Sequence, residues 1–68
     1  MNNQKISFVR SYLFYNKIYI DVIYNSCRVF TYTQDSIPET VKKYMTSATK
    51  IYKQYDRLYK REETIYRF

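Results

Sequence analysis

The side chains of this chain that could do chemistry are mostly basic or aromatic, and many alternate with apolar residues. Lysine and arginine reach phosphates or guanine edges, while tyrosine and phenylalanine contact sugars, thymine methyl groups or unstacked bases. The candidate contacts of this kind within extended segments are Arg10, Tyr12, Lys17, Tyr19, Arg28, Phe30 and Tyr32. Lys42 and Lys43 have no acid close after them and are further candidates for contacts along a phosphate backbone.

The residues that enzymes use most often are scarce in this sequence. There is no histidine and no glycine, which excludes a Ser/His/Asp set, a Cys/His set and a glycine-rich phosphate loop. The single cysteine, Cys27, can form no internal disulfide, and no histidine is present to join it in a zinc site. We interpret Cys27 as a small apolar filler. Neither an enzyme nor a bound cofactor or metal is expected.

Length and charge limit the class of protein. A chain of 68 residues is expected to form one domain, and such a domain buries only about 60% of its unfolded surface, so a homo-oligomer or a bound partner would add stability. The formal net charge of +6 favours a polyanionic partner, although it also serves solubility. No apolar run approaches the roughly 20 residues that cross a bilayer, and no leader is recognised, so an intracellular, cytoplasmic protein without membrane contact is expected. Ten tyrosines without a single glycine suggest an AT-rich gene of viral or mobile-element origin.

Three segments, at about 5–15, 17–24 and 27–34, are rich in β-branched and aromatic residues and predict three antiparallel strands. Two-residue turns at 15–16 and 25–26 would then set the register of both hairpins. The pairs expected from this count are Val9–Val22, Arg10–Asp21, Tyr12–Tyr19, Leu13–Ile18, Val22–Val29 and Tyr19–Tyr32.

This register divides the sheet into two faces of different character. One face carries no charge and is the expected core; its members are Ser7, Val9, Ser11, Leu13, Ile18, Ile20, Val22, Tyr24, Cys27, Val29, Thr31 and Thr33. The other face carries the aromatic and basic candidates and is expected to meet a partner. A dimer partner or plain solvent are the alternatives for that face. An error of one residue in either turn would exchange the two faces of the strand concerned.

A long helix is predicted after the strands. Ser36 and Glu39 have the spacing of a capping box, and Pro38 lies in the first turn, where its missing N–H does no harm. Apolar residues then recur in sevens with no glycine or proline between them, which indicates a helix over about 37–66. At about 42 to 45 Å it would overhang strands of about 30 Å.

The overhanging part of this helix would expose an apolar stripe that should not remain in water. Self-association through the stripe is the favoured outcome. A break near Thr46–Thr49, or further domains in a longer protein, are the alternatives. The residues expected to mediate self-association are Tyr55, Leu58, Tyr59, Ile65 and Tyr66.

The order of three antiparallel strands and a helix resembles the arm-type DNA-binding domain at the N-terminus of tyrosine-recombinase integrases. The stretches ISF, YIDVIYN and CRVFTYTQDSIP carry this resemblance, which covers about residues 5–60. It implies a three-stranded sheet in the major groove of DNA, and the residues it would place near the DNA are Arg10, Tyr12, Tyr19, Arg28, Phe30 and Tyr32. The turn glycine usual in that family is missing here, and no recombinase catalytic domain follows.

The sequence therefore predicts a single α+β domain of βββα order, with a three-stranded antiparallel sheet packed under one long C-terminal helix. Its expected function is to bind double-stranded DNA through the aromatic and basic sheet face, with lysine and arginine on the backbone and partial base readout. The alternative is a protein-binding module or inhibitor, such as a small viral anti-defence or regulatory protein, that docks on an acidic surface of a host protein.

Overall fold

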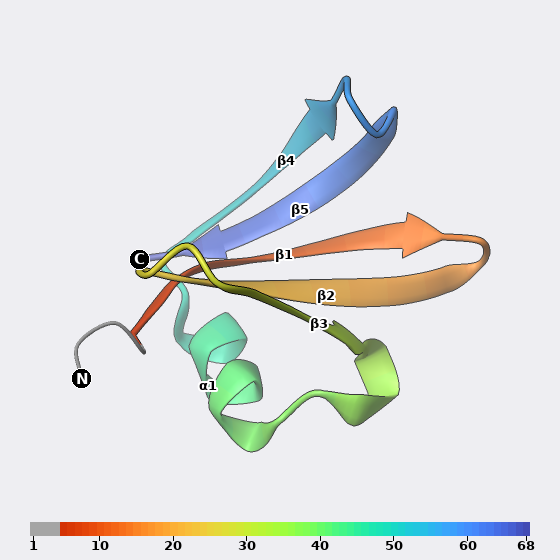
Figure 1. The fold of residues 1–68 in the computed structure, drawn as a ribbon. Helices are drawn as coiled ribbons and strands as arrows, with labels where there is room; N and C mark the ends of the chain where they lie inside the picture. Colours follow the sequence, from red (N-terminus) through yellow and green to blue (C-terminus); the bar gives the residue numbers. More distant parts are fainter. Residues whose placement is uncertain (1–4) are drawn as a thin grey trace.

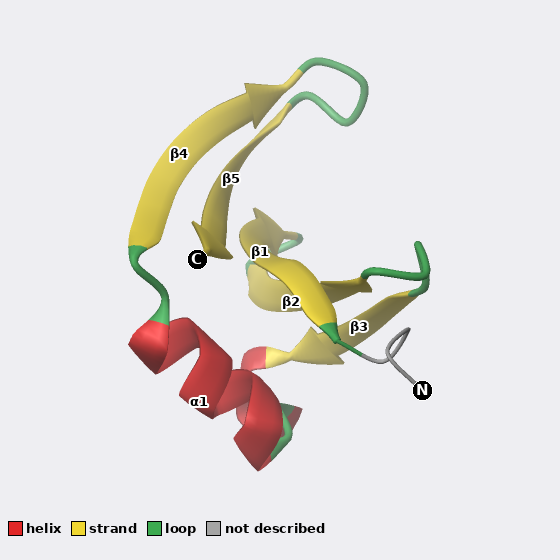
Figure 2. Cartoon of the chain, turned by 90° about the vertical axis from the view of Figure 1, so that its left-hand side faces the viewer, coloured by secondary structure: helices red, strands yellow, loops and turns green. Residues whose placement is uncertain are grey.

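The structure is a computed structural model that describes residues 5–68, and it forms a curved five-stranded sheet with one short α-helix (Figure 1). The elements in chain order are β1 (Ile6–Phe14), β2 (Lys17–Tyr24), β3 (Val29–Thr33), the 3₁₀ helix η2 (Gln34–Ser36), α1 (Glu39–Ser47), β4 (Lys50–Asp56) and β5 (Arg61–Arg67). All neighbouring strands are antiparallel, in the order β3-β2-β1-β5-β4. Helix α1 covers one face of the sheet, and the β4–β5 hairpin bends away from it (Figure 2).

The predicted long C-terminal helix over 37–66 is wrong. Helix α1 ends at Ser47, in the middle of the chain, and the backbone is extended at Ala48, with φ −58° and ψ 135°. Threonine and serine at 46–49 are weak helix formers, and from Lys50 tyrosines and β-branched residues, which strands favour, are frequent. The βββα order is therefore replaced by a five-stranded antiparallel sheet with a short helix between β3 and β4.

The turn between β4 and β5 forms without glycine, and for this reason it was not predicted. The Oδ1 atom of Asp56 accepts hydrogen bonds from the N–H groups of Leu58 at 2.8 Å and Tyr59 at 3.1 Å. An aspartate that binds the backbone two and three residues ahead stabilises a turn. Lys60 then takes the left-handed conformation, with φ 54°, to return the chain into β5.

The β1–β2 register is the one predicted from the sequence. Tyr15 and Asn16 have φ 48° and 64°, as both central residues of a two-residue type I′ turn require. The pairs observed include Val9–Val22, Arg10–Asp21, Tyr12–Tyr19 and Leu13–Ile18. A bulge between Ile6 and Phe8 then turns Ile6 toward the helix side.

The predicted β2–β3 register is wrong by one residue. The turn contains three residues, 25–27, because Cys27 adopts φ 70° and its N–H donates to the carbonyl of Tyr24 at 2.9 Å. This is the three-residue hairpin with a left-handed last position. Val22 therefore pairs with Phe30 and Ile20 with Tyr32, so the two faces of β3 are exchanged relative to the prediction.

The apolar core lies between α1 and the sheet and is small. Val9, Ile20 and Val22 from the sheet and Val41 from α1 form a buried cluster. Around it are the half-buried side chains Ile6, Tyr24, Tyr32, Ile37, Tyr44, Met45 and Tyr66. The opposite face of the sheet is also partly closed, because Asp21, Glu63 and Ile65 are buried there. The polar contacts of Asp21 and Glu63 therefore decide how this face is built.

Candidate nucleic-acid interface

The sheet face predicted to read DNA is organised around the buried carboxylate of Asp21, on β2. Arg10 donates from Nε to its Oδ2 at 2.9 Å, and the Tyr12 hydroxyl donates to its Oδ1 at 3.0 Å. The Thr31 hydroxyl of β3 adds a third hydrogen bond at 2.8 Å. Strands β1 and β3 thus contribute three donors to one carboxylate of β2, and the charge of Arg10 is neutralised within the protein.

A second buried carboxylate, that of Glu63 on β5, continues this network toward β4. Its Oε2 accepts from Arg61 Nε at 2.9 Å, and its Oε1 accepts from Gln54 Nε2 at 3.2 Å. The guanidinium carbon of Arg61 lies 3.5 Å from the ring centre of Tyr12 and 4.6 Å from that of Tyr59. Arg61 is therefore held by a carboxylate and two aromatic rings.

The pKa values of two residues in this network, Tyr12 and Arg10, are raised. Burial raises the pKa of Tyr12 above its ordinary value, and its hydrogen bond to Asp21 raises the pKa further. Burial would lower the pKa of Arg10, but the hydrogen bond and charge of Asp21 outweigh it, and the pKa is raised. Arg10 therefore stays charged and Tyr12 stays neutral at physiological pH, in the protonation states that the hydrogen bonds require.

The predicted strand contacts are not brought together on one face. Arg10, Tyr12 and Tyr19 share the face opposite α1, and the Tyr12 and Tyr19 rings stack with centres 6.1 Å apart. Phe30 and Tyr32 lie on the helix side instead, because the three-residue turn shifts β3. The placement of Phe30 and Tyr32 in a DNA-facing surface with Arg10 is thus corrected.

The remaining predicted contacts are exposed but scattered. Lys17 lies at the start of β2, beside the β1–β2 turn, and Arg28 directly follows the β2–β3 turn, with its guanidinium carbon 6.0 Å from the centre of the Phe30 ring. Lys42 and Lys43 lie on the exposed side of α1. Lys17 shares the face of Asp21 by register, whereas Arg28 lies beside the other turn and Lys42 and Lys43 lie on α1, so the four cations come from separate elements.

The residues predicted to form a self-association stripe are also separated. Tyr55, Leu58 and Tyr59 are exposed on the β4–β5 hairpin. Ile65 is buried on the sheet face opposite α1, whereas Tyr66 packs against the core on the helix side. The predicted apolar stripe does not form, because these residues lie in strands, where consecutive side chains point to opposite faces.

One sequence pattern was not used to predict the site, namely the uneven distribution of charge along the chain. Residues 42–60 contain six of the twelve lysines and arginines but one of the six acids, so they carry five of the six net positive charges. These six cations, which we call the basic edge, are Lys42, Lys43, Lys50, Lys53, Arg57 and Lys60. All are exposed, and within residues 5–68 none lies within 4 Å of a carboxylate.

The fold places the basic edge along one border of the molecule. Helix α1 leads directly into β4, which is the outermost strand of the sheet, and β4 leads to the projecting turn (Figure 2). Tyr52, Tyr55 and Tyr59 lie between the cations and are 42%, 59% and 58% exposed. The single acid, Asp56, is engaged in capping the turn. Lys50 and Tyr52 lie on the face of β4 opposite α1, and Lys53 and Tyr55 lie on the other face, so basic and aromatic side chains line both faces of an open border.

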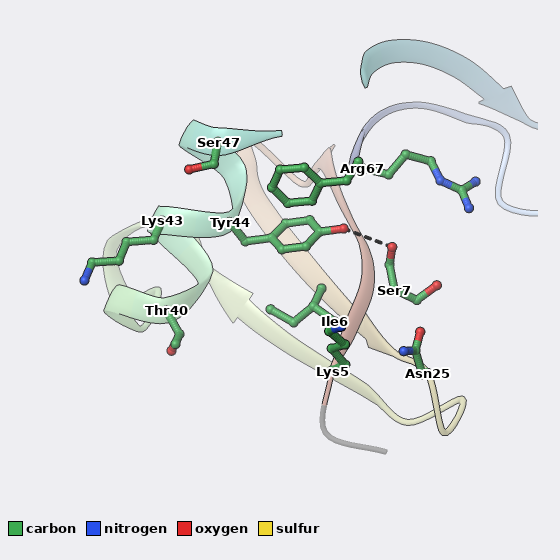
Figure 3. Close-up of a pocket in the computed structure, with 10 residues that line it drawn as sticks. Lys5, Ile6, Ser7, Asn25, Thr40, Lys43, Tyr44, Ser47 and Arg67 are labelled. Carbon is green, nitrogen blue, oxygen red and sulfur yellow. Dashed lines mark hydrogen bonds between the residues drawn. The ribbon is translucent and has the colours of Figure 1, made fainter. Parts of the chain in front are cut away.

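An open groove of about 860 Å³ lies between α1 and the ends of β1 and β5. Its floor contains Tyr44, whose hydroxyl donates to the carbonyl of Ser7 at 2.9 Å (Figure 3). Burial raises the pKa of Tyr44. The side chains of Lys43 and Arg67 point away from this groove in opposite directions (Figure 3). Because its cations do not converge, the groove is not an anion site comparable with the basic edge.

Other kinds of site find little support within residues 5–68. No three histidine, cysteine or carboxylate side chains there lie close enough to hold a metal ion. No helix of the same region has the length and apolar character needed to cross a membrane. Comparisons of the chain with protein-family models, curated proteins and solved structures found no match. The resemblance to the integrase arm-type domain therefore stays a prediction.

Proposed function

We propose that this protein binds nucleic acid, and duplex DNA in particular, through the basic edge. The observation that carries the proposal is the set of six exposed cations along one border, none of which has a carboxylate within 4 Å in the described chain. Cations of this kind release counterions when they meet phosphates, which supplies most of the affinity of non-specific DNA binding. Arg10 and Arg61 are excluded from this role, because Asp21 and Glu63 neutralise them.

The shape of the β4–β5 hairpin supports a duplex as the partner. It is a two-stranded antiparallel ribbon that bends away from the body of the protein (Figure 1). A ribbon of this kind fits the major groove of B-DNA. Its cations at Lys50, Lys53 and Arg57 would contact phosphates, and Tyr52 and Tyr55 would contact sugars or bases.

Protection of an edge strand does not account for all of these cations. Lysine on an outer strand is a common way to prevent unwanted pairing between sheets. Lys50 and Lys53 serve that purpose on β4. Lys42, Lys43 and Arg57 lie outside the strand, where no such pairing could form. A polyanionic partner explains the whole set.

The test is the affinity for a fluorescent duplex as a function of salt, measured by anisotropy. We expect log K to fall with log salt, with a slope of roughly −5 if all six cations contact phosphates. The double variant Lys50→Gln/Lys53→Gln should reduce the slope by roughly two. The matched control Lys17→Gln/Arg28→Gln has the same net charge and should keep the wild-type slope. Equal weakening by both pairs would reject the basic edge, and no affinity for any duplex would reject nucleic acid.

A second candidate function follows from the open side of β4. In the described chain no strand pairs with its outer edge, so its outward N–H and C=O groups remain available for another strand. An extended acidic segment of a partner protein could add there, with carboxylates beside Lys50 and Lys53. Binding of a Glu-rich peptide that protects β4 amides from hydrogen exchange, without affinity for DNA, would favour this function.

A further inference from the structure

The turn at the end of the β4–β5 hairpin holds an apolar side chain in water. Leu58, in the turn between β4 and β5, is 80% exposed, and this hairpin projects from the body of the protein (Figure 1). Arg57 precedes it and Lys60 follows two residues later, and both are exposed cations without a carboxylate within 4 Å. An isolated exposed leucine is common, but proteins that bend DNA insert apolar side chains, leucine among them, between base steps.

This turn is held in shape from inside the protein. Asp56 accepts hydrogen bonds from the N–H groups of Leu58 and Tyr59 at 2.8 and 3.1 Å. The Tyr59 ring packs on the guanidinium of Arg61, at 4.6 Å, and Arg61 is bound in turn to the buried carboxylate of Glu63. The backbone of the turn at Leu58 is therefore held before any partner binds. A preorganised turn loses little conformational freedom on binding.

We propose that Leu58 is a wedge that inserts between two base pairs of duplex DNA and bends the duplex. This inference rests on the proposed function, since it needs the β4–β5 hairpin on DNA. Apolar side chains inserted at a base step partly unstack it and kink the duplex, and the bend brings more phosphates to the protein. Arg57 and Lys60 are placed to contact the phosphates on either side of the opened step.

The β1–β2 turn is a less suitable wedge, although it also exposes apolar residues. The Tyr15 ring packs on the neighbouring Phe14 ring, with centres 4.4 Å apart. Lys17 is the nearest cation in sequence, and no cation precedes the turn closer than Arg10, which binds Asp21. Leu13, which is 62% exposed beside this turn, is therefore a matched control for Leu58.

The experiment is fluorescence energy transfer between dyes at the two ends of a short duplex, with the wild type, Leu58→Ala and Leu13→Ala. We expect the wild type to bring the ends closer and Leu13→Ala to do the same, whereas Leu58→Ala should bind without bending. A central mismatch lowers the cost of unstacking, so the wild type should prefer the mismatched duplex by roughly tenfold. Leu58→Ala should lose this preference.

Three outcomes would overturn the wedge. Binding of the wild type without bending would reject it and leave the proposed function standing. Equal bending by Leu58→Ala and the wild type would reject Leu58 as the inserted group. If the wild type ignores duplex DNA but binds phosphatidylserine vesicles through Leu58, the turn contacts a membrane surface, and both proposals fail.

Discussion

The guanidinium carbon of Arg61 lies 3.5 Å from the centre of the Tyr12 ring. Tyr12 and Glu63 form the last residue pair that β1 and β5 share. Beyond this pair the two hairpins separate (Figure 1). Arg61 also binds Glu63, whose side chain is fully buried. The contact therefore joins the β4–β5 hairpin, with most of the basic edge, to the rest of the sheet.

We expect Arg61→Ala to lower the free energy of unfolding by about 3 kcal/mol, because it leaves the Glu63 carboxylate buried without its charged partner. Urea denaturation followed by circular dichroism measures this. Lys60→Ala, at the exposed neighbouring position, is the control and should change stability by less than about 1 kcal/mol. Equal effects of the two variants would show that the Arg61 contacts add no stability.

Stability should fall at alkaline pH because of Tyr12. Its pKa is raised in the folded state above the ordinary value of 10.0, so the unfolded chain releases this proton at lower pH than the folded one. The stabilising contribution is full below pH 10 and is lost as pH rises through the folded pKa. Tyr12→Phe should give a smaller decline in the urea midpoint between pH 9 and pH 11. A decline as steep as that of the wild type would place the sensitivity in other groups.

Cys27→Gly should stabilise the protein by about 1 kcal/mol. Cys27 is exposed and adopts φ 70°, a conformation that costs residues other than glycine about 1 to 2 kcal/mol. The change relieves this cost but adds some freedom to the unfolded chain. Ser26→Gly, one position earlier in the turn, is the control and should not stabilise. Destabilisation by Cys27→Gly would argue against the three-residue turn.

The first hairpin could be predicted from the sequence because its signals were local. Asn16 marked a two-residue turn, and Arg10 with Asp21 supplied a charge pair whose register could be counted. The second hairpin failed because Cys27 is rarely left-handed, so nothing in its residue type indicated the extra turn residue. One residue was enough to exchange the faces of β3.

The secondary structure of the second half of the chain was predicted wrongly for a different reason. The tyrosines between 44 and 66 happened to match a helical repeat, and the turn at 57–60 contains neither glycine nor proline to interrupt it. The decisive contacts, such as Asp56 with its turn and Glu63 with Arg61, depend on the folded structure. The basic edge itself was visible as a charge asymmetry, although only the fold shows that it forms one border.

The most direct test of DNA binding through the basic edge is the titration of the ¹⁵N-labelled protein with a short duplex, followed by amide chemical shifts. The proposal predicts that the largest shift changes fall within residues 42–60, along α1, β4 and the projecting turn. Arg10, Asp21 and Thr31 should change little, because their side chains are bound to one another within the sheet. Changes centred on that network, or no change at several equivalents of duplex, would contradict it.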